Sequence, residues 1–154
     1  MERLIPAQQW ISSGWRPSQP REKASNCSIW SRAGGAVPAA GTAPPLRQHM
    51  DQLLEFSRTW DASRPMVIHC WAGISRSMAS AYAILCDRIG TGREIQIARA
   101  MRRRAPHAQP NRLLVRHADE ALERDGKMIL ALNSMGPPLV MEEGIATAFP
   151  LVDL

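Results

Sequence analysis

The sequence predicts an α/β fold, in which amphipathic helices accompany a short buried strand. Three observations support this prediction: a helical pattern at residues 43–61, an apolar run with a β-branched pair at residues 66–68, and a series of helical patterns after it. The length of 154 residues fits one domain, and 45% of the residues are hydrophobic, which is enough for a core. We therefore expect a folded domain over residues 43–154 and an atypical N-terminal segment over residues 1–42.

The N-terminal segment shows no regular periodicity. Its four prolines interrupt any helix or strand, and its three tryptophans follow neither spacing: Pro6, Pro17, Pro20, Pro38, Trp10, Trp15 and Trp30. Two interpretations stay open. The segment is either an irregular or disordered extension that covers part of the core, or a stretch that is not the natural N-terminus.

Helices are predicted wherever apolar residues recur at helical spacing. The first begins at Pro44 and Pro45, and it ends near Asp61, before the strand at residues 66–68. The next, residues 77–89, is apolar on nearly every face, which indicates a central and largely buried helix. Further helices are expected over residues 93–104, 111–124 and 127–135, and an irregular apolar tail follows residue 137.

The strand and the central helix flank a candidate phosphate-binding loop. A glycine-containing loop at a helix N-terminus presents backbone N–H groups that cradle an oxyanion. Cys70 is the candidate nucleophile, because those N–H groups, the helix N-terminus and Arg76 all favour its thiolate. The guanidinium of Arg76 holds two phosphoryl oxygens at once. The expected phosphate-binding residues are Trp71, Ala72, Gly73, Ile74, Ser75 and Arg76.

Two neighbours complete the predicted site. Ser77 is expected to donate a hydrogen bond to the sulfur as it leaves a phospho-cysteine intermediate, and His69 is expected to order the loop by hydrogen bonding. The alternative for Cys70 is an inert buried cysteine, the interpretation we keep for Cys27 and Cys86. His49, His107 and His117 lack metal-ligand spacing and are expected at the surface.

Residues 69–77 match the signature H-C-x-x-G-x-x-R-[S/T] of the cysteine-based tyrosine and dual-specificity phosphatases. The last two-thirds of the chain resembles small bacterial tyrosine-phosphatase-like proteins. The resemblance implies that residues 43–154 form a phosphatase-like domain with a central, mainly parallel sheet flanked by helices, incomplete in its N-terminal part. It also implies hydrolysis of phosphate monoesters, phosphotyrosine first, without a metal or other cofactor. Asn111 matches an asparagine that braces the loop in such phosphatases.

The chain departs from this family in its general acid. The family places an aspartate on a mobile loop upstream of the nucleophile, whereas no aspartate precedes Asp51 here. Asp51 lies on the polar face of a predicted helix, and Asp61 stands too close to the strand. Because general acid–base help contributes about 10²–10⁴-fold, activity is expected to be reduced for poor leaving groups. A phosphate-binding pseudophosphatase is therefore the alternative from another class.

The net charge and the cysteine content limit which binding partners and which cellular compartment we expect. The net charge of +5 favours anionic partners, which we take to be a phosphorylated protein or a small phosphate monoester. RNA 5′-phosphates and phosphoinositides stay open as substrates, and nucleic acid is a less favoured partner. Three cysteines without a disulfide framework favour a cytoplasmic setting, and no apolar run is long enough to cross a membrane.

Overall fold

The computed structural model describes residues 44–152, and their regular structure is helical. The described helices are α2 (Arg47–Thr59), α3 (Arg76–Ile89), α4 (Glu94–Arg104), α5 (Arg112–Ala121) and α6 (Lys127–Asn133). No helix among them is long and apolar enough to cross a membrane. The predicted N-terminal segment, residues 1–42, lies outside the described part of the chain.

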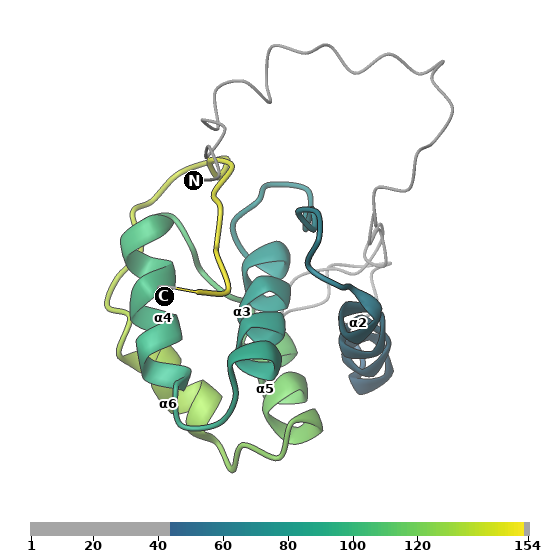
Figure 1. The fold of residues 1–154 in the computed structure, drawn as a ribbon. Coiled ribbons are helices and arrows are strands. Elements are labelled where there is room, and N and C mark those ends of the chain that lie inside the picture. The colour runs from purple at the N-terminus through teal and green to yellow at the C-terminus, as the bar shows by residue number, and fades with distance from the viewer. Residues whose placement is uncertain (1–43, 153–154) are drawn as a thin grey trace, which may run out of the picture.

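Helix α3 is the centre of the fold. It packs against α2, α4 and α5, while α6 contacts α4 and α5 on the side away from α2 (Figure 1). Every residue of α3 from Ser77 to Cys86 is buried, as the all-round apolar sequence predicted. The side chains packed around it include Met50, Leu53, Ile97, Met101, Leu114 and Met128, all nearly inaccessible to water.

The predicted central sheet is wrong for the described part of the chain. Residues 66–68 form no strand there; Val67 makes an isolated bridge and is 55% exposed. A strand becomes stable only when neighbouring strands pair with its backbone, and residues 44–152 provide no such neighbours. Helices α3 to α6 instead follow one another through short connections and bury their apolar faces against each other.

The predicted helices are confirmed, with differences at their ends. Helix α5 ends at Ala121 because the backbone turns left-handed at Glu123 (φ 53°), Asp125 (φ 52°) and Gly126 (φ 81°). Asp119 accepts the Gly126 and Met128 N–H groups, at 2.6 and 2.8 Å, and thereby fixes the start of α6. The helix predicted over residues 111–124 is thus shorter, and α6 begins where predicted.

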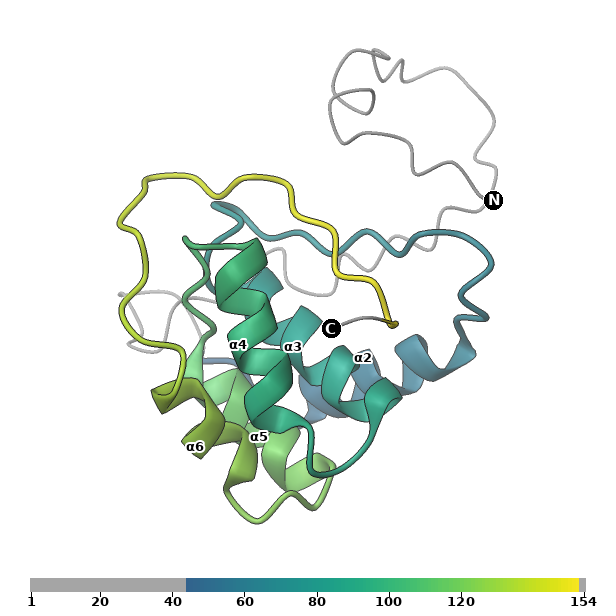
Figure 2. The ribbon, with the colours of Figure 1, turned by 60° about the vertical axis from the view of Figure 1, so that its left-hand side comes forward.

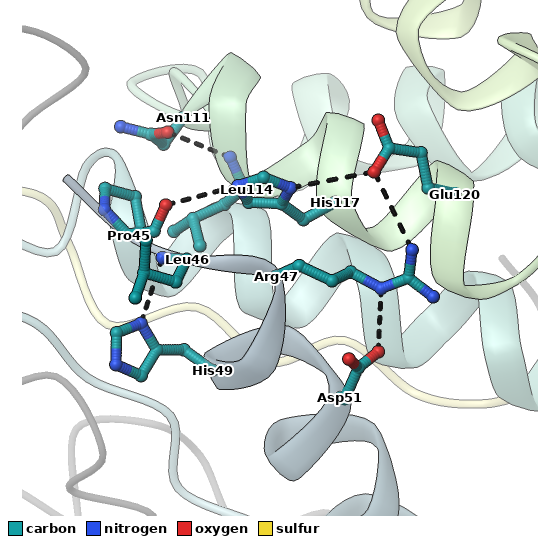
Figure 3. A network of polar contacts seen from close by, with 9 residues as sticks. All are labelled: Pro45, Leu46, Arg47, His49, Asp51, Asn111, Leu114, His117 and Glu120. Carbon is teal, nitrogen blue, oxygen red and sulfur yellow. Dashed lines mark hydrogen bonds and ion pairs between the residues drawn. The ribbon is translucent and has the colours of Figure 1, made fainter.

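Polar contacts hold the start of α2 against α5 (Figure 3). The Nε2 atom of His117 lies 3.2 Å from the Pro45 carbonyl oxygen, and Arg47 lies 3.7 Å from Glu120. The Arg47–Glu120 pair is about half exposed, so it contributes little energy. His117, expected at the surface, has a side chain only 17% exposed because it lies between the two helices.

Candidate active site

The candidate site lies where the chain enters α3. Cys70 is half-buried, and its Sγ atom lies 3.3 Å from the Oγ atom of Ser77, in the first turn of the helix. Backbone N–H groups of Gly73, Ser75 and Ser77 also donate to the sulfur. The loop therefore curls around the thiol, and its donors converge on one atom.

These contacts determine the acidity of Cys70. Burial by itself raises the pKa of the thiol, because it disfavours the charged form. The Ser77 hydroxyl and the three backbone N–H groups act in the opposite direction, and together they hold the pKa of Cys70 below its usual value. A lowered pKa increases the thiolate fraction at neutral pH, which makes a cysteine a better nucleophile.

Cys86 is the other free cysteine of the described residues, and its surroundings are opposite in effect. It is fully buried in α3, and burial raises the pKa of its thiol to about 12. The Cys86 thiol is therefore neutral and shielded from solvent, as the interpretation of an inert cysteine requires. Cys27 lies outside the described residues.

The backbone of the loop is held by the segment that follows α4. Gln109 N–H donates to the Ile74 carbonyl at 2.9 Å, and Asn111 N–H donates to the Ser75 carbonyl at 3.3 Å. Gly73 has a φ of 70°, a left-handed conformation that side-chain-bearing residues rarely adopt. The turn is thus fixed by one glycine and by two contacts from about 35 residues further along the chain.

Asn111 contacts the loop through its backbone. Its side-chain oxygen accepts the Leu114 N–H at 3.1 Å, which makes Asn111 the N-cap of α5 (Figure 3). The link from Asn111 to Ser75 uses the main-chain N–H instead. Asn111 therefore contacts the loop through its main chain and caps α5 with its side chain, and its predicted bracing role stays a prediction.

The remaining predicted site residues divide into two groups: His69, Trp71 and Ala72 line a cavity beside Cys70, whereas Ile74, Ser75 and Arg76 do not. Arg76 is the first residue of α3 and is half-buried. Trp71 is 93% exposed, so its indole packs against little of the protein and only its backbone is part of the wall of the loop. His69 is also exposed, and its imidazole has no hydrogen-bond partner among residues 44–152, so its ordering role stays a prediction. Ala72 and Ile74 are half-buried.

A cavity of about 550 Å³ opens beside Cys70. One end is lined by the loop, including Cys70, Ala72, Gly73 and Ser77, and the rest is mainly apolar. The apolar lining comes from the segment before the loop, from α3 and from the C-terminal segment, and includes Met66, Ile68, Met78, Ile84 and Phe149. No three His, Cys, Asp or Glu side chains of the described chain gather as metal ligands.

The C-terminal segment, residues 137–152, is a part of the site that sequence reasoning missed. It runs over the ends of α3 and α4 (yellow in Figure 2), and Gly144 N–H donates to the Ala72 carbonyl at 2.7 Å. A Cβ atom at Gly144 would lie 2.7 Å from the Gly73 oxygen and 2.8 Å from the His107 ring. Only glycine fits there, and no local spacing in the sequence reveals a contact between residues 72 and 144.

His107 was expected at the surface and is buried. It is 2% exposed and packs against Gly144, between the C-terminal segment and the end of α4. Burial, together with the nearby charge of Arg102, lowers the pKa of His107, so the ring is neutral at pH 7. A neutral, buried His107 supports the docking of the C-terminal segment on the loop.

The two aspartates considered as general acids lie elsewhere. Asp51 pairs with Arg47 at 2.9 Å on the outer face of α2, and Asp61 accepts hydrogen bonds from Ser63. Neither aspartate lines the cavity beside Cys70. In the described chain, these two residues therefore do not supply an acid next to the nucleophile.

Comparison with known proteins identifies the class of protein. A family model described as Y_phosphatase, protein-tyrosine phosphatase, matches residues 27–108, which include the loop, all of α3 and all of α4. The match spans more than half of the chain, so this chain belongs to the protein-tyrosine phosphatase family. The match begins at residue 27, inside the N-terminal segment of residues 1–42 for which we predicted no regular element. No curated protein and no solved structure matches the chain significantly.

The contact between Ser77 and Cys70 predicts a shift in thiol acidity. In Ser77→Ala, the pKa of Cys70 should rise, because one donor to the thiolate is lost while burial remains. The pH dependence of iodoacetamide alkylation, followed by mass spectrometry of the Cys70 peptide, should move to higher pH. Ser80→Ala is the matched control, because Ser80 is a buried serine of α3 without a contact to the sulfur. An unchanged profile in Ser77→Ala would contradict this account.

The two roles of Asn111 can be separated by substitution. Asn111→Ala should lower the free energy of unfolding by about 1 kcal/mol, because the cap of α5 is lost. Asn111→Asp keeps an acceptor oxygen and should lose much less. Both variants retain the backbone N–H, so the alkylation profile of Cys70 should stay as in the wild type. Urea unfolding and alkylation measure the two effects; an alkylation shift in Asn111→Ala alone would show that the side chain itself braces the loop.

Proposed function

We propose that this member of the protein-tyrosine phosphatase family hydrolyses phosphate monoesters through a phospho-cysteine on Cys70. The observation that carries the proposal is the convergence of the Ser77 hydroxyl and three loop N–H groups on the Cys70 sulfur. Such an arrangement stabilises negative charge, whether on a thiolate or on a phosphoryl group bound in the same loop. It occurs inside the family's own signature, residues 69–77.

The proposed reaction has two steps. The Cys70 thiolate attacks phosphorus, and the loop N–H groups from Trp71 to Arg76 bind the equatorial oxygens together with the Arg76 guanidinium. Water then hydrolyses the phospho-cysteine. Ser77 donates its hydroxyl proton in a hydrogen bond to the departing sulfur, which its position 3.3 Å from Cys70 favours.

Phosphotyrosine is the proposed substrate. The cavity beside Cys70 is mainly apolar, which suits an aromatic ring attached to the phosphate better than a sugar or an inositol ring with several hydroxyl groups. A phosphorylated protein would bring such a ring on an exposed side chain. RNA 5′-phosphates and phosphoinositides are the competing substrates, and the feature that favours them is the positive net charge of the chain.

A phosphate-binding protein without hydrolytic activity is the second candidate. The observation that favours it is the absence of Asp51 and Asp61 from the cavity lining. Such a protein would hold a phosphorylated partner in the same loop and release it unchanged.

Turnover of p-nitrophenyl phosphate separates the two candidates. We expect the full chain to hydrolyse this aryl phosphate and Cys70→Ser to fall to background, because the serine hydroxyl is a far weaker nucleophile at pH 7. Cys86→Ala should keep activity, since Cys86 lies buried in α3 away from the cavity lining.

Background rates for both the wild type and Cys70→Ser would contradict the enzyme proposal. Binding of a tyrosine-phosphorylated peptide by both proteins would then assign the loop to phosphate binding alone.

A further inference from the structure

The cavity beside Cys70 contains a carboxylate that no sequence motif indicates. Among the carboxylates of residues 44–152, Glu143 alone lines this cavity. Several others have partners elsewhere: Asp51 with Arg47, Asp87 with Arg58, and Glu94 with Arg124. Glu143 makes no ion pair or hydrogen bond with any described residue, so its carboxyl group is available to a substrate.

The backbone of Glu143 is held next to the phosphate-binding loop. The following residue, Gly144, donates its N–H to the Ala72 carbonyl at 2.7 Å. Its Cα also packs so closely on Gly73 and His107 that no side chain fits. A second tie, from Leu139 N–H to the Pro106 carbonyl at 2.8 Å, fixes the other end of the same segment. The backbone of Glu143 therefore lies between two main-chain hydrogen bonds, one before it in the chain and one after it.

We propose that Glu143 is the general acid of the reaction, supplied by the C-terminal segment in place of an upstream aspartate. The proposal rests on the phosphatase function proposed above and names the acid which that function lacks. Glu143 and Cys70 line the same cavity, and the residue after Glu143, Gly144, is hydrogen-bonded to the loop that follows Cys70.

The proton balance of the reaction follows from this placement. As the sulfur–phosphorus bond forms and the phosphorus–oxygen bond of the ester breaks, the protonated Glu143 gives its proton to the leaving oxygen. The product alcohol or phenol departs. Water then attacks the phospho-cysteine, gives its proton to the Glu143 carboxylate, and releases phosphate and the Cys70 thiolate. The carboxyl group and the thiolate are both regenerated.

His69 is the other titratable side chain, besides Cys70 itself, that the cavity lining contains. It directly precedes the nucleophile and, like Glu143, has an exposed side chain that no contact fixes among the described residues. The two residues differ in their backbone, because Glu143 belongs to a segment from another part of the chain that is hydrogen-bonded to the loop. Positioning therefore favours Glu143, and His69 serves as the rival in the test.

The experiment compares two substrates whose leaving groups differ in acidity. Wild type, Glu143→Gln, Glu142→Gln and His69→Gln are assayed with p-nitrophenyl phosphate and with phenyl phosphate, each over a range of pH. Glu142 is the matched control, since it is the adjacent exposed carboxylate and does not line the cavity. Phenolate needs a proton far more than p-nitrophenolate does, so loss of an acid affects phenyl phosphate most.

We expect kcat of Glu143→Gln for phenyl phosphate to fall on the order of 10²–10⁴-fold, with a much smaller loss for p-nitrophenyl phosphate. The decline of wild-type kcat at high pH, where the acid is deprotonated, should disappear in this variant. Glu142→Gln should behave as wild type. A variant that merely loosened the C-terminal segment would lose both substrates equally and keep the high-pH decline.

Three results would overturn the proposal. These are equal losses for both substrates, wild-type behaviour of Glu143→Gln, or a leaving-group-dependent loss in His69→Gln alone. Each presupposes Cys70-dependent turnover of p-nitrophenyl phosphate by the wild type. If that turnover is absent, the proposed function itself has failed, and the two failures are thereby distinguished.

Discussion

Opposing effects set the pKa of the Cys70 thiol, which lies where the chain enters α3, and the site depends on their balance. Burial raises the pKa of the thiol, while the Ser77 hydroxyl and three backbone N–H groups lower it by more. Those donors reach the sulfur only because α3 begins at Arg76 and Gly73 allows the loop to turn back. Helix α3 is itself fixed by burial along most of its length against α2, α4 and α5. The reactivity of one atom is thus linked to the packing of the whole helical core.

Segments distant in sequence complete the site that the loop begins. The chain after α4 holds the loop through Gln109 and Asn111, and the C-terminal segment holds it through Gly144. His107 lies where these two segments meet. Because the tie at Gly144 also places Glu143 in the cavity, one contact links the support of the loop to the proposed source of the proton.

Local chemistry was predictable from the sequence, and long-range arrangement was not. The helices follow from apolar periodicity. The loop follows from the spacing of Cys70, Gly73, Arg76 and Ser77, which all lie within one short stretch of the sequence. The sheet was inferred from family resemblance rather than from strands visible in the sequence, and residues 44–152 contain none. The docking of Gly144 and the burial of His107 depend on contacts between distant segments that leave no periodic signal. The predicted roles of the individual loop residues stay predictions.

The most direct test of this account is to trap the covalent intermediate. The full chain is mixed with p-nitrophenyl phosphate, quenched in acid within the first turnover, digested and examined by mass spectrometry. We predict one added phosphoryl group on the Cys70 peptide, none on Cys86, and a larger trapped fraction in Ser77→Ala, where release of the sulfur is slowed. Turnover of the ester with Cys70 unmodified at every time, in the wild type and in Ser77→Ala alike, would contradict the account.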